Sequence, residues 1–290
     1  MKVFLVILVI LLIMAAAVVV ESYRELRQIR LTRYAITDKS IPAQLKGKSL
    51  IFLSDYHEAI EGQLNDRIIK KIDSVKPAAI LLGGDMLNGK NPMEDVSPAS
   101  DLIIGLAEKY PVYYAFGNHE KKVISDYYGT KHLWDEYTEK LGDSAHFLLN
   151  ECVSLDSIGL GNVTLYGLDI PLEYYSRFSY PKLDSYNISG MLGKRKPGEY
   201  SILLAHTPDF IDGYADWDAD LVLSGHFHGG LVRLPLLGGL VSPRLRLFPK
   251  YDYGRYRSGD TTMIVTNGIG QHSLKIRIGN IPEIVVLDFK

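Results

Sequence analysis

Cysteine is nearly absent from this chain of 290 residues, and that absence excludes several kinds of protein. The single cysteine, Cys152, can form neither a disulfide within the chain nor a cysteine zinc cluster. A cysteine-dependent phosphatase would need an arginine six residues after its nucleophile, but Ile158 stands at that position. We therefore expect Cys152 to be a small, buried apolar residue.

An excess of charge of either sign is also missing. The chain has 32 basic and 34 acidic residues, which gives a formal net charge of −2 at pH 7. Proteins whose surface is built to hold nucleic acid are usually strongly basic, so we expect no nucleic-acid partner. The chain also has no linker rich in glycine and serine and no repeat of fixed period, and its 47% hydrophobic content is ordinary for a folded globular protein.

One long hydrophobic run stands at the N-terminus. Residues 3–20 are 18 consecutive apolar residues, with Lys2 before them and Glu21 after them. As a helix the run would be about 27 Å long, close to the roughly 30 Å hydrocarbon core of a bilayer. A cleaved signal peptide is the alternative, because residues 15–17 are alanines and form a small-residue site. We favour an uncleaved single-pass membrane anchor, because residues 18–20 continue the run.

This run divides the chain. We expect a transmembrane anchor at residues 1–21, a juxtamembrane segment at residues 22–39 and one domain at residues 40–290. Arginine recurs at every third position of the juxtamembrane segment, at Arg24, Arg27, Arg30 and Arg33. An ordinary basic membrane flank is the simplest interpretation, and by the positive-inside rule alone it would place the domain in the cytoplasm.

Apolar strands and helices alternate along the rest of the chain. Residues 64–75 carry apolar side chains at helical spacing and stop before Pro77, and residues 99–110 predict a second helix. The expected strands are residues 48–54, 78–82, 112–116, 162–168, 201–205, 221–223, 261–266 and 283–289. The opening order of strand, helix, strand, helix and strand predicts an α/β fold with a mainly parallel sheet and ligands at the carboxyl ends of its strands.

Polar residues that could carry chemistry collect where five of these strands end. They are Asp55, His57, Asp85, Asn118, His119, His206, His226 and His228. Mixed carboxylate, amide and imidazole donors suit Mn²⁺, Fe or Zn²⁺, whereas a Mg²⁺ or Ca²⁺ site would be nearly all oxygen. The donors are too many for one ion. We therefore expect two divalent metal ions, bridged by a carboxylate, which can orient a phosphate and activate a water for attack.

The same residues carry a family resemblance. The motifs Asp55-Tyr56-His57, Gly84-Asp85, Gly117-Asn118-His119-Glu120, His206 and Gly225-His226-Phe227-His228 resemble those of the calcineurin-like metallophosphoesterases. The resemblance covers nearly everything after residue 34 and is closest to a membrane-anchored bacterial branch. It implies an α/β sandwich of two packed mixed β-sheets flanked by helices, behind an N-terminal transmembrane helix. It also implies a domain outside the cytoplasm, against the arginine count, so the side of the membrane stays open.

The resemblance implies a role for each site residue. One metal ion would be held by Asp55, His57, Asp85 and His228, and the other by Asp85, Asn118, His206 and His226. His119 would face the phosphate as a general acid or a cationic stabiliser, without binding metal. The chain departs from the family pattern at Tyr56, at Glu58 and Ala59, and at Leu231. No departure removes a ligand, so we expect these positions to bear on substrate choice.

These observations lead to one main hypothesis and two alternatives. The main hypothesis is a membrane-tethered, manganese-dependent hydrolase that cleaves a phosphomonoester or phosphodiester by attack of metal-activated water. The anchor suggests a lipid-linked substrate, so one alternative is a pyrophosphatase acting on a nucleotide such as UDP-2,3-diacylglucosamine. The other alternative is a non-catalytic binding module on the same fold. The complete ligand set and the presence of His119 argue against that module.

Overall fold

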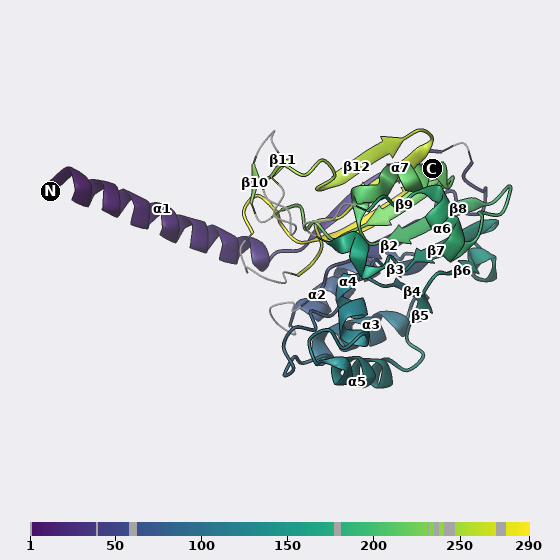
Figure 1. Cartoon of the computed structure of the whole chain (residues 1–290), viewed down its shortest axis with the longest axis horizontal. Coiled ribbons are helices and arrows are strands. Elements are labelled where there is room, and N and C mark those ends of the chain that lie inside the picture. Colours follow the sequence, from purple (N-terminus) through teal and green to yellow (C-terminus); the bar gives the residue numbers. More distant parts are fainter. Residues whose placement is uncertain are drawn as a thin grey trace.

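The computed structural model of the protein describes residues 2–38, 40–57, 63–176, 181–230, 232–234, 238–240, 247–270 and 277–290. A long N-terminal helix, α1 (Lys2–Leu26), projects from a body built of two six-stranded β-sheets and the helices around them (Figure 1). The N-terminus lies at the free end of α1, far from the body.

The first sheet has the strand order β1-β14-β2-β3-β4-β5. Its strands are β1 (Arg30–Ile36), β14 (Glu283–Phe289), β2 (Ser49–Leu53), β3 (Ala79–Leu82), β4 (Val112–Ala115) and β5 (His146–Leu148). Only the pairing of β14 with β2 is antiparallel among these neighbours. Strands β2, β3 and β4 are apolar nearly throughout because both faces of this sheet are covered.

The second sheet has the order β12-β13-β9-β8-β7-β6. Its strands are β12 (Gly254–Ser258), β13 (Thr261–Val265), β9 (Leu221–Ser224), β8 (Tyr200–Ala205), β7 (Val163–Leu168) and β6 (Glu151–Ser154). The inner pairings are parallel, and the two edge strands, β12 and β6, are antiparallel to their neighbours. A separate short ribbon pairs β10 (Arg233–Leu234) with β11 (Gly238–Gly239).

Three apolar clusters hold these layers together. The middle cluster joins the two sheets, with Leu50 and Phe52 of β2 packed among residues such as Leu204 of β8. The outer face of the first sheet is covered by α2 (Gln63–Val75), α3 (Ser97–Ala107) and α5 (Lys131–Leu141). The outer face of the second sheet is covered by α6 (Ser185–Leu192) and α7 (Ile211–Asp216). The remaining elements are α4 (Asn118–Ile124), η1 (Leu155–Ile158), η2 (Leu172–Tyr175) and η3 (Pro208–Phe210).

The sandwich of two mixed sheets flanked by helices confirms the fold class expected from the resemblance. Every helix and strand expected in the body is present, with ends that differ by at most three residues. The expectation of a buried Cys152 is wrong, because this residue lies on the edge strand β6 and is exposed. Strand β6 is exposed along most of its length, so the environment of Cys152 is not apolar.

The segment after α1 is part of the first sheet. Strand β1 pairs in parallel with β14 over its whole length, from Arg30 opposite Glu283 to Ile36 opposite Phe289. Arg33 forms an ion pair of 2.7 Å with Asp288 on β14. Arg30 and Arg33 therefore belong to a strand of the body as well as to the basic flank.

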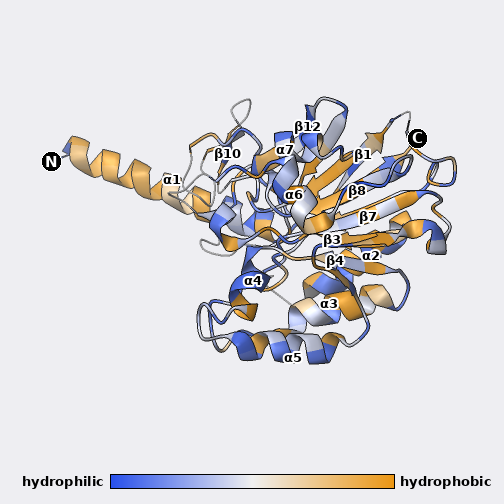
Figure 2. Ribbon diagram, turned by 45° about the vertical axis from the view of Figure 1, so that its right-hand side comes forward, coloured by the Kyte–Doolittle hydropathy of each residue, from blue (hydrophilic) through white to orange (hydrophobic). Residues whose placement is uncertain are grey.

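Helix α1 is apolar along nearly all of its length, as its colour in Figure 2 shows. It is long and apolar enough to cross a membrane, and none of its most apolar window is buried against the protein. A core helix of similar composition would be mostly buried. The membrane anchor and the signal sequence are therefore the two interpretations that remain.

Candidate metal centre

The residues predicted from the sequence lie together at the carboxyl ends of the central strands of both sheets. They are Asp55 and His57 after β2, Asp85 after β3, Asn118 and His119 at the start of α4, His206 after β8, and His226 and His228 after β9. All eight are at most 7% exposed. The carboxyl ends of β2, β3 and β4 meet those of β8 and β9 because the two sheets pack face to face.

Their donor atoms form three overlapping groups, in each of which the atoms lie within 4.8 Å of one another. The groups are Asp55, His57 and His228; His57, Asp85 and His119; and Asp85, His206 and His226. Asp85 belongs to two of these groups, and so does His57. The backbone N–H of His119 donates to Asp85 Oδ1 at 2.8 Å, which places Asn118, the preceding residue, beside the same carboxylate.

Donor atoms face one another at short range in this pocket. Asp55 Oδ1 lies 3.2 Å from His228 Nε2, and His57 Nε2 lies 3.3 Å from the same nitrogen. On the other side, His206 Nε2 lies 3.0 Å from Asp85 Oδ2. His119 stands slightly further away, with its Nε2 at 4.0 Å from Asp85 Oδ2.

The backbone at the site adopts strained conformations. Asp55, His57, Asp85, His226 and His228 have φ values of 55°, 43°, 54°, 69° and 51°, in the left-handed region that side chains with a Cβ rarely occupy. Such strain is held in place by the surrounding fold and concentrates at functional sites. Here it turns five side chains inward at the points where their strands end.

Glycines allow the carboxylates to lie against the chain. A Cβ added to Gly117 would stand 2.2 Å from Asp85 Oδ1, and one added to Gly225 would stand 2.2 Å from Asp55 Oδ2. Neither position has room for a side chain. The glycines next to the proposed ligands therefore set how closely the two acidic groups approach the backbone.

The electrostatics of the pocket fit bound cations. Burial raises the pKa of Asp55 to about 7, so the carboxylate form costs free energy that a neighbouring cation would offset. Burial lowers the pKa of His119 to about 4. Burial also disfavours the charged form of His206, but the carboxylates of Asp85 and Asp55 outweigh it and raise the pKa of His206 to about 9.

The hydrogen bonds of His206 and the buried side-chain oxygen of Asn118 also favour bound cations. His206 Nδ1 lies 2.7 Å from the carbonyl oxygen of Gly83, so this nitrogen carries a proton and donates it. In the neutral ring the lone pair of Nε2 then faces the carboxylate of Asp85, an arrangement that a divalent cation between them would stabilise. Asn118 Oδ1 is buried and has no hydrogen-bond partner among the described residues. The donor set therefore suits divalent metal ions with mixed oxygen and nitrogen ligands.

Glu120 supports the site, although no role for it is predicted from the sequence. Its buried carboxylate accepts hydrogen bonds from the backbone N–H groups of Asp85 at 2.9 Å, Met86 at 2.6 Å and Gly117 at 2.9 Å. It therefore ties the loop after β3 to the loop after β4. Its place in the Gly117-Asn118-His119-Glu120 motif was the available signal, but nothing in the sequence identified its partners.

Tyr175 was also missed. Its ring meets that of His226 edge to face, with 5.2 Å between the ring centroids, and lies 6.1 Å from that of His206. It comes from η2, a short turn beyond β7, and no local pattern predicts that this turn reaches the site.

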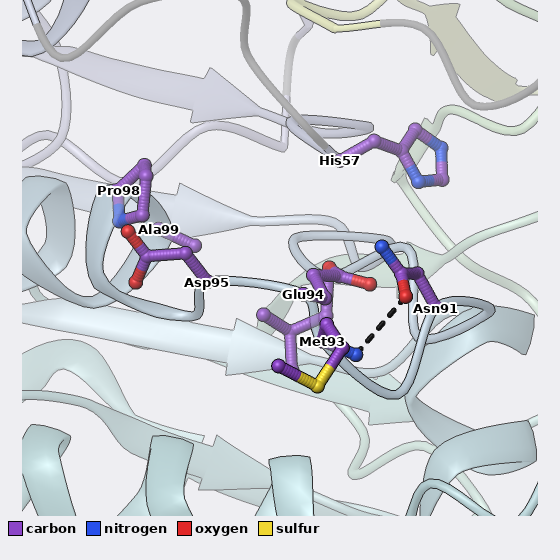
Figure 3. Close-up of a pocket in the computed structure, with 8 residues that line it drawn as sticks. His57, Asn91, Met93, Glu94, Asp95, Pro98 and Ala99 are labelled. Carbon is purple, nitrogen blue, oxygen red and sulfur yellow. Dashed lines mark hydrogen bonds between the residues drawn. The ribbon is translucent and has the colours of Figure 1, made fainter.

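A cavity of about 260 Å³ opens beside His57 (Figure 3). Its lining is completed by Leu87, Asn91, Met93, Glu94, Asp95, Pro98 and Ala99, from the loop after β3 and the start of α3. Tyr56 supports this wall from inside the core, because its hydroxyl donates to Asn65 Oδ1 at 2.7 Å and lies 3.2 Å from the carbonyl oxygen of Pro98. The other departures from the family pattern, Glu58, Ala59 and Leu231, lie outside the described residues.

Comparison with known proteins agrees with this geometry. The family model described as calcineurin-like phosphoesterase matches residues 48–230, the span that contains all eight site residues. The chain belongs to the calcineurin-like phosphoesterase family, whose members use a dinuclear metal centre, and it is a hydrolase that acts on phosphoric ester bonds. This confirms the resemblance drawn from the motifs.

Individual relatives are similar over most of the chain. An uncharacterized metallophosphoesterase of Bacillus subtilis, YkuE, is 26% identical over 279 residues, which cover 92% of this chain and 88% of the relative. The phosphodiesterase YaeI of Escherichia coli is 27% identical over 247 residues, which cover 82% and 81%. A transmembrane protein with a metallophosphoesterase domain from Danio rerio is 27% identical over 259 residues, which cover 87% of this chain and 55% of that protein.

Proposed function

We propose that the protein is a membrane-tethered phosphohydrolase with two divalent metal ions, most suitably Mn²⁺, that cleaves a phosphomonoester or phosphodiester. The observation that carries this proposal is the set of three overlapping groups of buried carboxylate and imidazole side chains, two of which share Asp85. The tether is supported by α1, an exposed apolar helix long enough to cross a bilayer.

The proposed ligands divide into two sets. The first ion would be held by Asp55, His57, Asp85 and His228, and the second by Asp85, Asn118, His206 and His226. The short distances within each set support this division, as does the position of Asp85 between them. When bound, the two ions would polarise the phosphoryl group and activate the attacking water.

His119 is proposed to act on the substrate. Its Nδ1 lies against the carbonyl oxygen of Asn88, so Nδ1 carries a proton and donates it to that oxygen. Its Nε2 points into the pocket, 4.0 Å from Asp85 Oδ2. A phosphate held there would bring negative charge close to the ring and raise its pKa, which favours the protonated form. In that form Nε2–H can donate to the leaving oxygen or stabilise its developing charge.

The substrate is proposed from the position of the site. The cavity beside His57 can take the group attached to the phosphate, and its lining combines the apolar side chains of Leu87, Met93 and Pro98 with the amide of Asn91. The second candidate is a lipid-linked pyrophosphate such as UDP-2,3-diacylglucosamine. It is favoured by the attachment of α1 to the body next to the site.

A hydrolysis screen tests the proposal. Full-length protein in detergent would be stripped with a chelator, reloaded with Mn²⁺, and assayed with nitrophenyl phosphate, bis-nitrophenyl phosphate and a lipid-linked nucleotide pyrophosphate. We expect chelation to abolish hydrolysis and about two equivalents of Mn²⁺ to restore it. A protein that binds metal but hydrolyses none of the three classes would instead support the non-catalytic alternative.

A further inference from the structure

Hydrogen bonds connect the end of α1 to the turn that carries His228. The side-chain amide of Asn280, just before β14, donates to the carbonyl oxygen of His228 and, at 2.8 Å, to that of Gly230. A Cβ added to Gly229 would stand 2.7 Å from Asn280 Oδ1, so the turn packs directly on this amide. Asn280 therefore holds a strained turn in which His228 itself has a φ of 51°.

Asn280 is in turn held by α1. Glu25, in the last turn of α1, accepts hydrogen bonds from the backbone N–H groups of Gly279 at 3.0 Å and Asn280 at 2.9 Å. Ser22, one turn earlier, accepts a bond of 2.9 Å from the backbone N–H of Arg277. Both side chains belong to residues that are only 4% exposed, although the helix before them is exposed.

Arg277 extends this network to the imidazole of His228. Its fully buried guanidinium donates to the carbonyl oxygens of Asn267 at 2.9 Å and Gly270 at 2.7 Å. The Gly270 carbonyl oxygen also lies 3.3 Å from His228 Nδ1. The carbonyl oxygen of Gly270 thus contacts both the guanidinium of Arg277 and Nδ1 of His228. This contact orients the imidazole so that Nε2 faces Asp55 Oδ1 at 3.2 Å.

The charge of Glu25 also acts on Arg277. A buried guanidinium is costly unless negative charge lies nearby, and Glu25 is one of three carboxylates that stabilise Arg277, with Asp55 and Glu283. Glu25 thus supports both ends of the network, through two backbone N–H groups and through the charge of Arg277.

We propose that Glu25 is a positioning residue of the metal centre, which acts through Asn280 and Arg277 to fix the backbone and the ring of His228. The last turn of the N-terminal helix is then part of the site as well as part of the tether. This inference rests on the proposed role of His228 as a metal ligand. Groups that orient ligands typically change metal affinity by about 10- to 100-fold when they are removed.

Manganese binding to the full-length protein in detergent tests this role. Glu25→Ala should weaken the binding of one Mn²⁺ equivalent by about tenfold or more, as measured by titration with metal analysis. Glu25→Gln keeps one acceptor oxygen and should lie between Glu25→Ala and the wild type. The matched control is Glu21→Ala, one turn earlier on α1, where the carboxylate is exposed and pairs with Arg24.

Unfolding of the metal-free proteins separates positioning from folding. A cooperative thermal transition in Glu25→Ala, together with weakened Mn²⁺ binding, supports the proposal. If Glu25→Ala does not fold, Ser22→Ala removes the oxygen that accepts the backbone N–H of Arg277 and should weaken Mn²⁺ binding by about twofold or more. A folded Glu25→Ala, or failing that a folded Ser22→Ala, with Mn²⁺ affinity equal to that of Glu21→Ala would overturn it.

Two further measurements keep this inference apart from the proposed function. If the wild type binds no Mn²⁺, or if His228→Ala binds it as the wild type does, the proposed metal centre itself is wrong. If His228→Ala loses metal and Glu25→Ala does not, only the positioning role of Glu25 is wrong.

Discussion

Asp85 stands between the two proposed metal positions, and its loss should disturb both. We expect Asp85→Ala to lower activity more than Asn118→Ala, because Asn118 is proposed to hold one ion only. Metal analysis after Mn²⁺ loading should find less metal in Asp85→Ala than in Asn118→Ala. Small and equal losses in the two variants would show that Asp85 is not the bridge.

His119 should behave differently from the other histidines of the pocket. If it donates to the leaving group, His119→Ala should keep its metal and lose roughly 10²- to 10⁴-fold in turnover, the range typical of a lost general acid. The loss should shrink for nitrophenyl esters, whose leaving group needs little protonation. His226→Ala is the comparison, since it should lose metal and activity together. A His119→Ala protein that loses metal to the same extent would mean that His119 is a ligand.

Gly225 offers a test of how the carboxylates are placed. A methyl group at this position would collide with Asp55 Oδ2 and Ser54 Oγ, both 2.2 Å away. Gly225→Ala should therefore displace Asp55 and weaken Mn²⁺ binding, which calorimetric titration can measure. Gly190→Ala is the control, because nothing lies within 4 Å of its added Cβ and the position is inside α6. Equal affinities in the two proteins would show that the Asp55 carboxylate tolerates displacement.

The gathering of the eight polar residues at the strand ends could be predicted because its signals are local. Each proposed ligand lies within four residues of the end of an apolar strand, so the strand pattern and the donor are both visible in a short stretch of sequence. Glu25, Arg277 and Asn280 could not be predicted in this way. Their roles depend on contacts between segments more than 250 residues apart, such as that between Glu25 and Asn280. Nothing in either segment indicates the other.

At the scale of elements, β1 is one of the strands that the sequence did not predict, as are β5, β6 and β12. Its arginines are also typical of a membrane flank, and its partner β14 lies at the far end of the chain. The insertion of β14 between β1 and β2 is likewise a pairing of distant segments, with no local signal. The central strands of the two sheets were predictable because each is a short apolar run bounded by glycine or polar residues.

Two fragments can test how much β1 contributes. A fragment of residues 22–290 keeps β1, whereas one of residues 40–290 starts at the boundary expected from the sequence. The shorter fragment loses the burial of Ile29 and Ile36, which are 6% and 3% exposed and are worth about 1.5–3 kcal/mol each. Urea unfolding should therefore give the shorter fragment a lower free energy of unfolding. Equal midpoints would place the start of the domain at residue 40 after all.

At the scale of the whole molecule, the anchor and the signal peptide predict different products. If α1 stays attached, the full-length protein should remain in the membrane pellet after an alkaline carbonate wash and appear only in detergent. The fragment of residues 22–290 is the control and should be soluble in both conditions. The mass of the purified protein distinguishes the anchor from the signal peptide directly, because cleavage near residues 15–17 would remove most of the apolar run.

The junction between α1 and the body is short and fully held. Only residues 27–29 separate the end of α1 from the start of β1. Within them the carbonyl oxygen of Arg27 accepts a bond of 2.6 Å from Arg67, and Ile29 is buried. If α1 spans the bilayer as proposed, these contacts restrain the body at this junction and hold the proposed metal centre near one height above the lipid. Such an enzyme meets its substrate by diffusion in the plane of the membrane, so the rate of encounter depends on the number of substrate molecules per unit area of membrane.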